Sequence, residues 1–348
     1  MLVIDMDNYS TVQAALNAHT YDAAGTTLLF PNGWNGVESS IWDFVACGQT
    51  YGNTDAPIVF KRENDTATAT IEVGGHLMDE TSGQGKILFD GISFTYPGAE
   101  NTASYFIQNT TSEVHNVGFK DCSFISPDAT QQGGLVGNSA NCHIYRCYFK
   151  NLLAVTVDGI ATQILNSVFD NAGLAIAGGY ITNCLWLSDH PDARPTLGRN
   201  RRRCNKLSYC TFINKGGGYT GLKNRRALVN NCIFKGYDYA IENTGEFFTT
   251  YEYGARTARQ YKSNCFYGNS NIYLDDTSVD RGIGTMCEED PIILDRDPFP
   301  MPGVYVPDMD PISEYVGWNP TQIAKSTYAG AFAFAGGAIP VPTLQVRY

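Results

Sequence analysis

The stretch "LSYCTFINKG" at residues 207–216 is followed 22 residues later by a close repeat, "VNNCIFKGYD" at residues 229–238. Each copy holds a Cys, any one residue, a Phe, and then a cluster drawn from Lys, Asn and Gly. Self-similarity at a period of roughly 20–50 residues indicates a repeat architecture, in which each unit buries its apolar face only by packing against its neighbours. This motif therefore decides the fold class.

Eight copies of the motif can be aligned on their aromatic residue, and successive copies lie 17 to 32 residues apart. The aromatics are Phe94, Phe124, Phe149, Phe169, Trp186, Phe212, Phe234 and Phe266. The small residues assigned ahead of them are Gly91, Cys122, Cys147, Ser167, Cys184, Cys210, Cys232 and Asn264. Alternate residues of a strand face the same side. The small residue and the aromatic are therefore predicted to face inward, and the residue between them, such as Ser123, Tyr148 or Thr211, to face outward.

A fixed strand motif with variable gaps indicates stacked strands whose insertions are confined to the turns. A four-stranded propeller blade needs about 40–45 residues, more than the repeat supplies, so the pattern favours a parallel β-solenoid. Asn151, Asn171 and Asn214 each follow the aromatic by two residues. We expect a left-handed turn residue there, a conformation that Asn tolerates.

Three further stretches resemble the right-handed parallel β-helix proteins, the pectate-lyase-like superfamily in the broad sense. They are "STVQAALNAHTYDAAGTTLLFPNGW" (10–34), similar to a capping helix with a first strand, "APIVFKR" (56–62), similar to a second strand, and the exit "SNCFYGN…DPIIL…YAGAFAF". The resemblance implies an all-β, right-handed, single-stranded parallel β-helix with a short N-terminal capping helix and an irregular C-terminal segment. It does not imply one activity, because this superfamily includes lyases, hydrolases, adhesins and phage tailspikes.

The same comparison suggests three parts of the chain. Residues 1–36 are expected to form the N-terminal cap with its helix and first strand, residues 37–275 the β-helix coils, and residues 276–348 an acidic, Pro-rich segment that ends in an extended arm. No run of about 18 apolar residues is present, so no membrane span is expected. The N-terminus also lacks the pattern of a secretory signal.

Ten cysteines occur, none of them in a CxxC motif. Metal binding is therefore not indicated. Disulfides are typical of small secreted chains, so buried free thiols that act as small apolar side chains are favoured over a disulfide framework.

Charge is unevenly distributed. The chain has a formal net charge of −11, yet residues 191–262 hold 9 Arg and 5 Lys against 5 acidic residues. We expect this basic segment to contact a partner subunit or an acidic glycan, with Tyr251 and Tyr253 from the aromatic stretch 247–261 as an interface or a sugar-stacking platform. Internal pairing with the acidic stretch 263–314 and a merely solvated face are the alternatives. The predicted contact residues are Arg199, Arg202, Arg203, Arg225, Arg226, Arg256, Arg259, Tyr251 and Tyr253. Nucleic acid is not an expected partner, because the rest of the protein would repel it.

Catalytic residues, metal ligands and cofactors are not predicted. "NTD" (53–55), "GGH" (74–76) and "DD" (275–276) lack the order and placement found in polygalacturonase-like enzymes of this fold. His190 with Asp189 and Asp192 is more typical of an ordinary turn than of acid–base chemistry. Two carboxylate pairs, Asp158 with Asp170 and Glu242 with Glu246, remain possible without being indicated.

Three functions stay open. The favoured hypothesis is a virion structural protein, a phage spike, fibre or capsid-decoration subunit, which forms a homotrimer and contacts other virion proteins or a surface glycan. The second is an extracellular polysaccharide lyase or glycoside hydrolase that acts on an acidic glycan. The third is a non-catalytic glycan-binding adhesin.

Overall fold

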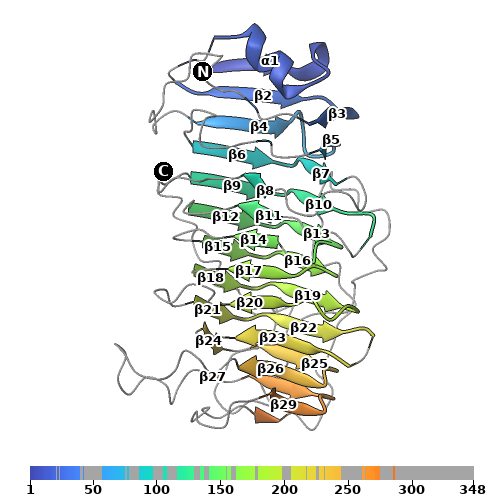
Figure 1. Cartoon of the computed structure of the whole chain (residues 1–348). Coiled ribbons are helices and arrows are strands. Elements are labelled where there is room, and N and C mark those ends of the chain that lie inside the picture. Colours follow the sequence, from blue (N-terminus) through green and yellow to red (C-terminus); the bar gives the residue numbers. More distant parts are fainter. Residues whose placement is uncertain are drawn as a thin grey trace.

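A computed structural model of the chain describes residues 1–20, 22, 24–39, 42, 57–74, 77, 86–96, 105–107, 116–128, 134–136, 141–153, 155–157, 162–176, 179–197, 205–216, 218–224, 227–230, 232–243, 261–262, 264–274 and 285–286. These residues form mostly parallel β-strands, which stack along one long axis (Figure 1). The all-β prediction is confirmed, and the arrangement is compatible with a parallel β-helix.

Sheet A contains eleven strands and begins at the N-terminal end of the stack. In spatial order they are β1 (Leu2–Asp5), β2 (Thr26–Phe30), β4 (Ile58–Arg62), β6 (Lys86–Asp90), β9 (Asn116–Lys120), β12 (Asn141–Tyr145), β15 (Thr162–Leu165), β18 (Gly179–Thr182), β21 (Asn205–Ser208), β24 (Ala227–Asn230) and β27 (Tyr261–Lys262).

Sheet B also contains eleven strands, and it carries the aromatic motif. They are β3 (Trp34–Glu38), β5 (Ala69–Val73), β7 (Ser93–Thr95), β10 (Ser123–Ile125), β13 (Tyr148–Lys150), β16 (Val168–Asp170), β19 (Leu185–Ser188), β22 (Thr211–Asn214), β25 (Ile233–Lys235), β28 (Cys265–Tyr267) and β30 (Thr285–Met286).

Sheet C has eight strands: β8 (Tyr105–Ile107), β11 (Gly134–Val136), β14 (Val155–Val157), β17 (Leu174–Ile176), β20 (Pro195–Leu197), β23 (Thr220–Asn224), β26 (Tyr239–Asn243) and β29 (Asn271–Leu274). From β6 onward the chain mostly visits sheets A, B and C in turn, for example through β9, β10 and β11. We call one such passage a rung.

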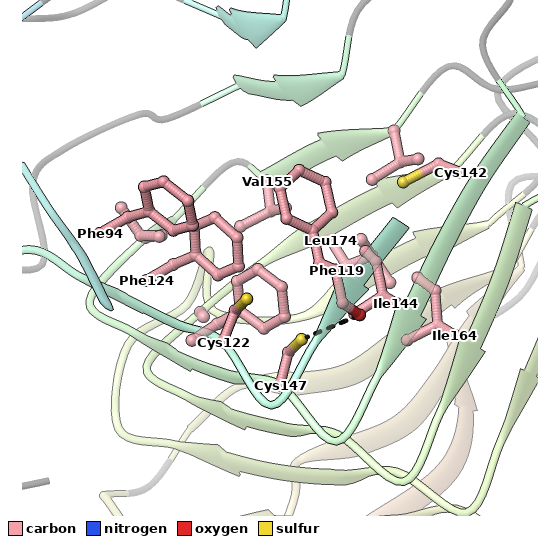
Figure 2. Packing of buried hydrophobic residues seen from close by; sticks show 14 of the residues in the cluster. Phe94, Phe119, Cys122, Phe124, Cys142, Ile144, Cys147, Val155, Ile164 and Leu174 are labelled. Carbon is pink, nitrogen blue, oxygen red and sulfur yellow. Dashed lines mark hydrogen bonds between the residues drawn. The ribbon is translucent and has the colours of Figure 1, made fainter. Parts of the chain in front are cut away.

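The aromatic residues of sheet B form a continuous stack inside the molecule. Phe149 and Phe169 have ring centroids 4.8 Å apart with planes 4° from parallel. Trp186 stacks on Phe169 at 4.5 Å, and stacked pairs link Phe94 at one end to Phe266 at the other. The spacing is close to that of neighbouring strands, about 4.8 Å, so the predicted inward column is confirmed. Figure 2 shows Phe94 against Phe124, beside Phe119 from sheet A.

Short turns with a left-handed residue join sheet A to sheet B. The φ angle is positive at Gly91, Asp121, Arg146, Asn166, Asn183 and Tyr209, each directly ahead of the inward small residue. Gly91 therefore belongs to this turn, and our assignment of it to the small-residue column was wrong. Since Ser93 pairs with Ser123 and Phe94 with Phe124, Ile92 fills the column beside Cys122. A Cβ atom on Gly91 would also lie 2.3 Å from Nε of Arg62.

The expected turn residues after the aromatic are confirmed at two of three positions. Asn151 and Asn171 have φ angles of 57° and 49°. Asn214 instead continues strand β22, and the prediction for it was wrong. Its side chain receives a hydrogen bond from the backbone N–H of Gly216 (3.1 Å) and donates one to the carbonyl of Gly236 (2.9 Å). The left-handed position after Phe234 is taken by Gly236.

Six cysteines are described as free, buried thiols, as predicted: Cys122, Cys142, Cys147, Cys184, Cys210 and Cys232. Cys47, Cys204 and Cys287 lie outside the described residues, and Cys265 begins strand β28. The Cys147 thiol donates to the carbonyl of Phe119 across 3.5 Å (Figure 2). Burial raises the pKa of the Cys147 and Cys184 thiols, so these groups remain protonated and act as small core side chains.

The N-terminal end carries the predicted helix, α1 (Val12–Ala18), preceded by a short 3-10 helix, η1 (Met6–Asn8) (Figure 1). Thr11 caps α1 by accepting a hydrogen bond from the N–H of Ala14. The buried carboxylate of Glu38 accepts from the N–H of Val12 and from the indole of Trp42 (2.9 Å). Burial raises the pKa of Glu38, and these two hydrogen bonds oppose that rise.

Candidate functional site

All nine residues predicted to contact a partner or glycan lie outside the described residues. They are Arg199, Arg202, Arg203, Arg225, Arg226, Arg256, Arg259, Tyr251 and Tyr253. Strand β23 ends at Asn224 and β24 begins at Ala227, so Arg225 and Arg226 fall between two described strands. The predicted contact band stays a prediction.

Two described cations of the basic segment 191–262 form ion pairs within the chain. Arg194 Nη1 lies 2.9 Å from Glu242 Oε2, and Lys223 Nζ lies 3.2 Å from Glu242 Oε1. Lys223 and Glu242 are register partners on strands β23 and β26, so the cluster joins neighbouring rungs on sheet C. Internal pairing therefore occurs with Glu242. The acidic residues of the stretch 263–314 lie outside the described residues, so pairing with that stretch stays a prediction.

A second charged cluster lies on sheet B. Lys215 Nζ is 3.4 Å from Asp170 Oδ1, and the hydroxyl of Tyr148 donates to Asp170 Oδ2 across 3.0 Å. Lys235 sits over the ring of Tyr267, 5.6 Å from its centroid, a cation–π geometry. Lys206 and Lys215 are both exposed, and Lys215 also pairs with Asp170.

These clusters are poorly suited to acid–base catalysis. A general acid must carry a proton near the working pH and reach its substrate, whereas both carboxylate oxygens of Glu242 are already engaged by cations of the same chain. Glu246 and Asp158, the possible carboxylate partners of Glu242 and Asp170, lie outside the described residues. The two pairs therefore remain untested, and each described member is already bound to a cation.

The loop around His190 is an ordinary turn in its hydrogen bonding. The backbone N–H of Asp192 donates to His190 Nδ1 (3.2 Å), and the N–H of Ala193 donates to the His190 carbonyl (3.1 Å). Ser188 Oγ closes the loop with a 2.8 Å bond to the carbonyl of Ala193. The imidazole thus orders its own loop, which supports the structural interpretation.

A third ionic network ties the A-to-B turns together. Arg146 donates from Nε to Asp121 Oδ1 (2.6 Å) and forms an ion pair with its other oxygen. Lys120 binds both oxygens of Asp90 at 3.1 Å. The hydrogen bonds that Arg146 donates to Asp121 raise the pKa of Arg146. Asp121 itself is buried, so this network links adjacent rungs and leaves Asp121 little access to a ligand.

The residues of sheet B that were predicted to face outward are buried. Ser123 and Tyr148 have 0% exposure and Thr211 has 7%. Along the same outer face, Val168, Leu185, Leu187, Ile213 and Ile233 are also buried, yet they lie outside the core cluster. Period-2 alternation gave their direction correctly, but it carries no information on what covers them.

The outer face of sheet A, unlike that of sheet B, carries exposed side chains. His143, Gln163, Tyr180 and Lys206 follow one another in register across strands β12, β15, β18 and β21. Tyr180 is 56% exposed and Lys206 is exposed beside it. Burial lowers the pKa of His143, while a hydrogen bond with Gln163 opposes this shift. Sequence analysis did not single out these residues, because no local motif marks a register partner.

Within the described part of the chain, no group of three or more His, Cys, Asp or Glu side chains is arranged to hold a metal ion. In that same part, none of the helices has the length and apolar character needed to cross a membrane.

Comparisons with known proteins returned no match: no family model fits the chain, and neither the curated proteins nor the solved structures contain a significantly similar one. The resemblance to the pectate-lyase-like superfamily therefore rests on the sequence pattern and on the parallel sheets described above.

Proposed function

We propose that the chain folds as a right-handed, single-stranded parallel β-helix and serves as a structural protein of a virus particle, as a phage spike, fibre or capsid-decoration subunit. The observation that supports this best is the continuous aromatic stack from Phe94 to Phe266. It spans eight neighbouring strands of sheet B and suits a rigid rod. In this role the protein forms a homotrimer in the virion and contacts other virion proteins.

The described ionic clusters favour this role over catalysis. Glu242, Asp170 and Asp121 are each bound to cations of the same chain, so they act as cross-links between rungs. Buried free thiols are also consistent with assembly in a reducing compartment.

Contact with an acidic glycan is a second candidate, and one described feature favours it. Tyr180 is exposed on sheet A with Gln163 and Lys206 as its register neighbours. An exposed aromatic ring can stack on a sugar, an amide can bind its hydroxyl groups, and a lysine can bind a uronate carboxylate. The site would hold a saccharide without cleaving it.

A substrate screen separates the structural role from the enzyme alternative. We expect no shortening of acidic polysaccharides incubated with the purified protein, measured by reducing ends and by ultraviolet absorbance of unsaturated products. A released product would overturn the structural proposal. In that case Arg202→Ala and Arg225→Ala should abolish the activity while the fold is retained. Undiminished cleavage by both variants would show that the predicted Arg band is not the substrate groove.

A further inference from the structure

The outer face of sheet B is an apolar strip that is buried although it lies outside the core. Its members are Tyr148, Val168, Leu185, Leu187, Ile213 and Ile233. Neighbouring strands place Val168, Leu185, Thr211 and Ile233 in one continuous register. Exposures of 0% at Val168 and Leu185 cannot arise on an open sheet face, so another layer must cover the strip.

The described strands and helices do not supply that layer. Every described strand belongs to sheets A, B or C, and the described helices lie at the N-terminal cap (Figure 1). Sheet A packs against the inner side of sheet B, where Phe119 meets Phe124 at 5.3 Å.

We propose that the outer face of sheet B is the docking surface for the C-terminal segment of the same chain, residues 287–348. Position supports this choice. The last strand of sheet B is β30, which ends at Met286, and the segment begins at the next residue. It therefore leaves from the end of the very sheet whose outer face is covered.

Length and composition also fit. The strip crosses the six strands β10, β13, β16, β19, β22 and β25, about 24 Å at a strand spacing of about 4.8 Å. Since an extended chain spans about 3.3 Å per residue, some eight residues are enough. The stretch "AFAFAGGAIPVPTLQV" (331–346) supplies repeated apolar side chains. Its two prolines cannot donate backbone hydrogen bonds, so it suits packing on a face better than adding a strand to an edge.

Charge favours the same arrangement. Residues 287–348 contain 8 acidic residues against 3 basic ones, a net charge of −5. Lys150 and Lys235 lie at the edge of the apolar strip on the outer side of sheet B, where Lys215 is already paired with Asp170. An acidic segment with apolar stretches matches an apolar strip with a basic margin. This inference does not depend on the proposed function.

Site-specific photocrosslinking tests the proposal on the full-length chain. p-Benzoylphenylalanine is placed at Ile213, which is 6% exposed, and in a second variant at Lys150 on the margin of the strip, where the substitution disturbs less packing. Tyr180 on sheet A carries the same probe as the matched control. We expect both sheet B probes to form intramolecular links to peptides within 287–348, and the Tyr180 probe to form none.

Three outcomes would overturn the proposal: links from both sheet B probes to another region of the same chain, links to a second copy that appear as a dimer band, or equal labelling of 287–348 from Tyr180. Limited proteolysis gives an independent readout. Leu185→Asp should make the segment at least about tenfold more susceptible to cleavage, whereas Tyr180→Asp should leave it unchanged. Equal cleavage in the wild-type chain and Leu185→Asp would contradict the docking.

Discussion

Sheets A and B alternate inward and outward residues in the same way, yet their outer faces differ. Sheet A presents Tyr180 and Lys206 to solvent. Sheet B hides Val168 and Leu185 completely. The inner faces of both are apolar, as a strand stack requires. The difference shows that a third layer, and not strand geometry, decides which outward residues become part of a buried surface.

The largest change in stability is expected when a charge is placed on the outer face of sheet B and, for comparison, on that of sheet A. Leu185→Asp should destabilise the protein by about 3 kcal/mol, because it places a carboxylate at a fully buried apolar position. Tyr180→Asp, in the neighbouring strand of the chain, should change the free energy of unfolding by less than about 0.5 kcal/mol. Urea unfolding followed by tryptophan fluorescence measures both. Equal effects would mean that the two faces are equally exposed in solution.

A smaller loss of stability is expected when the hydroxyl of Tyr148 is removed. Tyr148→Phe removes the hydrogen bond to Asp170 and should cost about 1 kcal/mol, since the partly buried acceptor loses a partner. Tyr145 lies on the outer side of sheet A and is partly exposed, so Tyr145→Phe is the control and should have almost no effect. A neutral Tyr148→Phe would argue that water reaches Asp170.

The half-buried His143 of sheet A should make the stability of the protein depend on pH. Burial lowers the pKa of His143 below 6.5, so below pH 6.5 the unfolded chain binds a proton that the folded chain does not. Stability should therefore fall as the pH is lowered from 7 through 6.5 towards the folded pKa. His143→Gln should flatten the unfolding free energy in this window. An unchanged slope in the variant would assign the effect to other groups.

The smallest effect on stability, and the most specific effect on binding, is expected at Tyr180. Tyr180→Ala should leave the melting temperature nearly unchanged and reduce retention on an immobilised acidic oligosaccharide at low salt. Gln163→Ala should weaken retention less, because it removes a hydrogen bond rather than a stacking surface. Retention that is equal in all three proteins would remove this face from the glycan hypothesis.

Much of the architecture could be predicted from the sequence, because the motif fixes both strand position and side-chain direction. The aromatic column, the capping helix and the free cysteines followed from local patterns. Gly91 was misassigned because the turn and the strand both accept a small residue, and only the register with Asp121 separates them. Asn214 was misassigned because β22 extends by one residue to pair with Ser188.

The candidate site was less predictable because its contacts join distant parts of the sequence. Arg194 reaches Glu242 across 48 residues, and that contact depends on the lengths of the intervening turns. The segment that we propose to cover the outer face of sheet B likewise carries no repeat motif. Local periodicity cannot report either contact.

The molecular mass in solution tests the structural role most directly, measured by size-exclusion chromatography with light scattering at low and high salt. The account predicts a trimer or larger assembly that loosens as salt screens its charged contacts. A monomer of 38.1 kDa at both salt concentrations would contradict it.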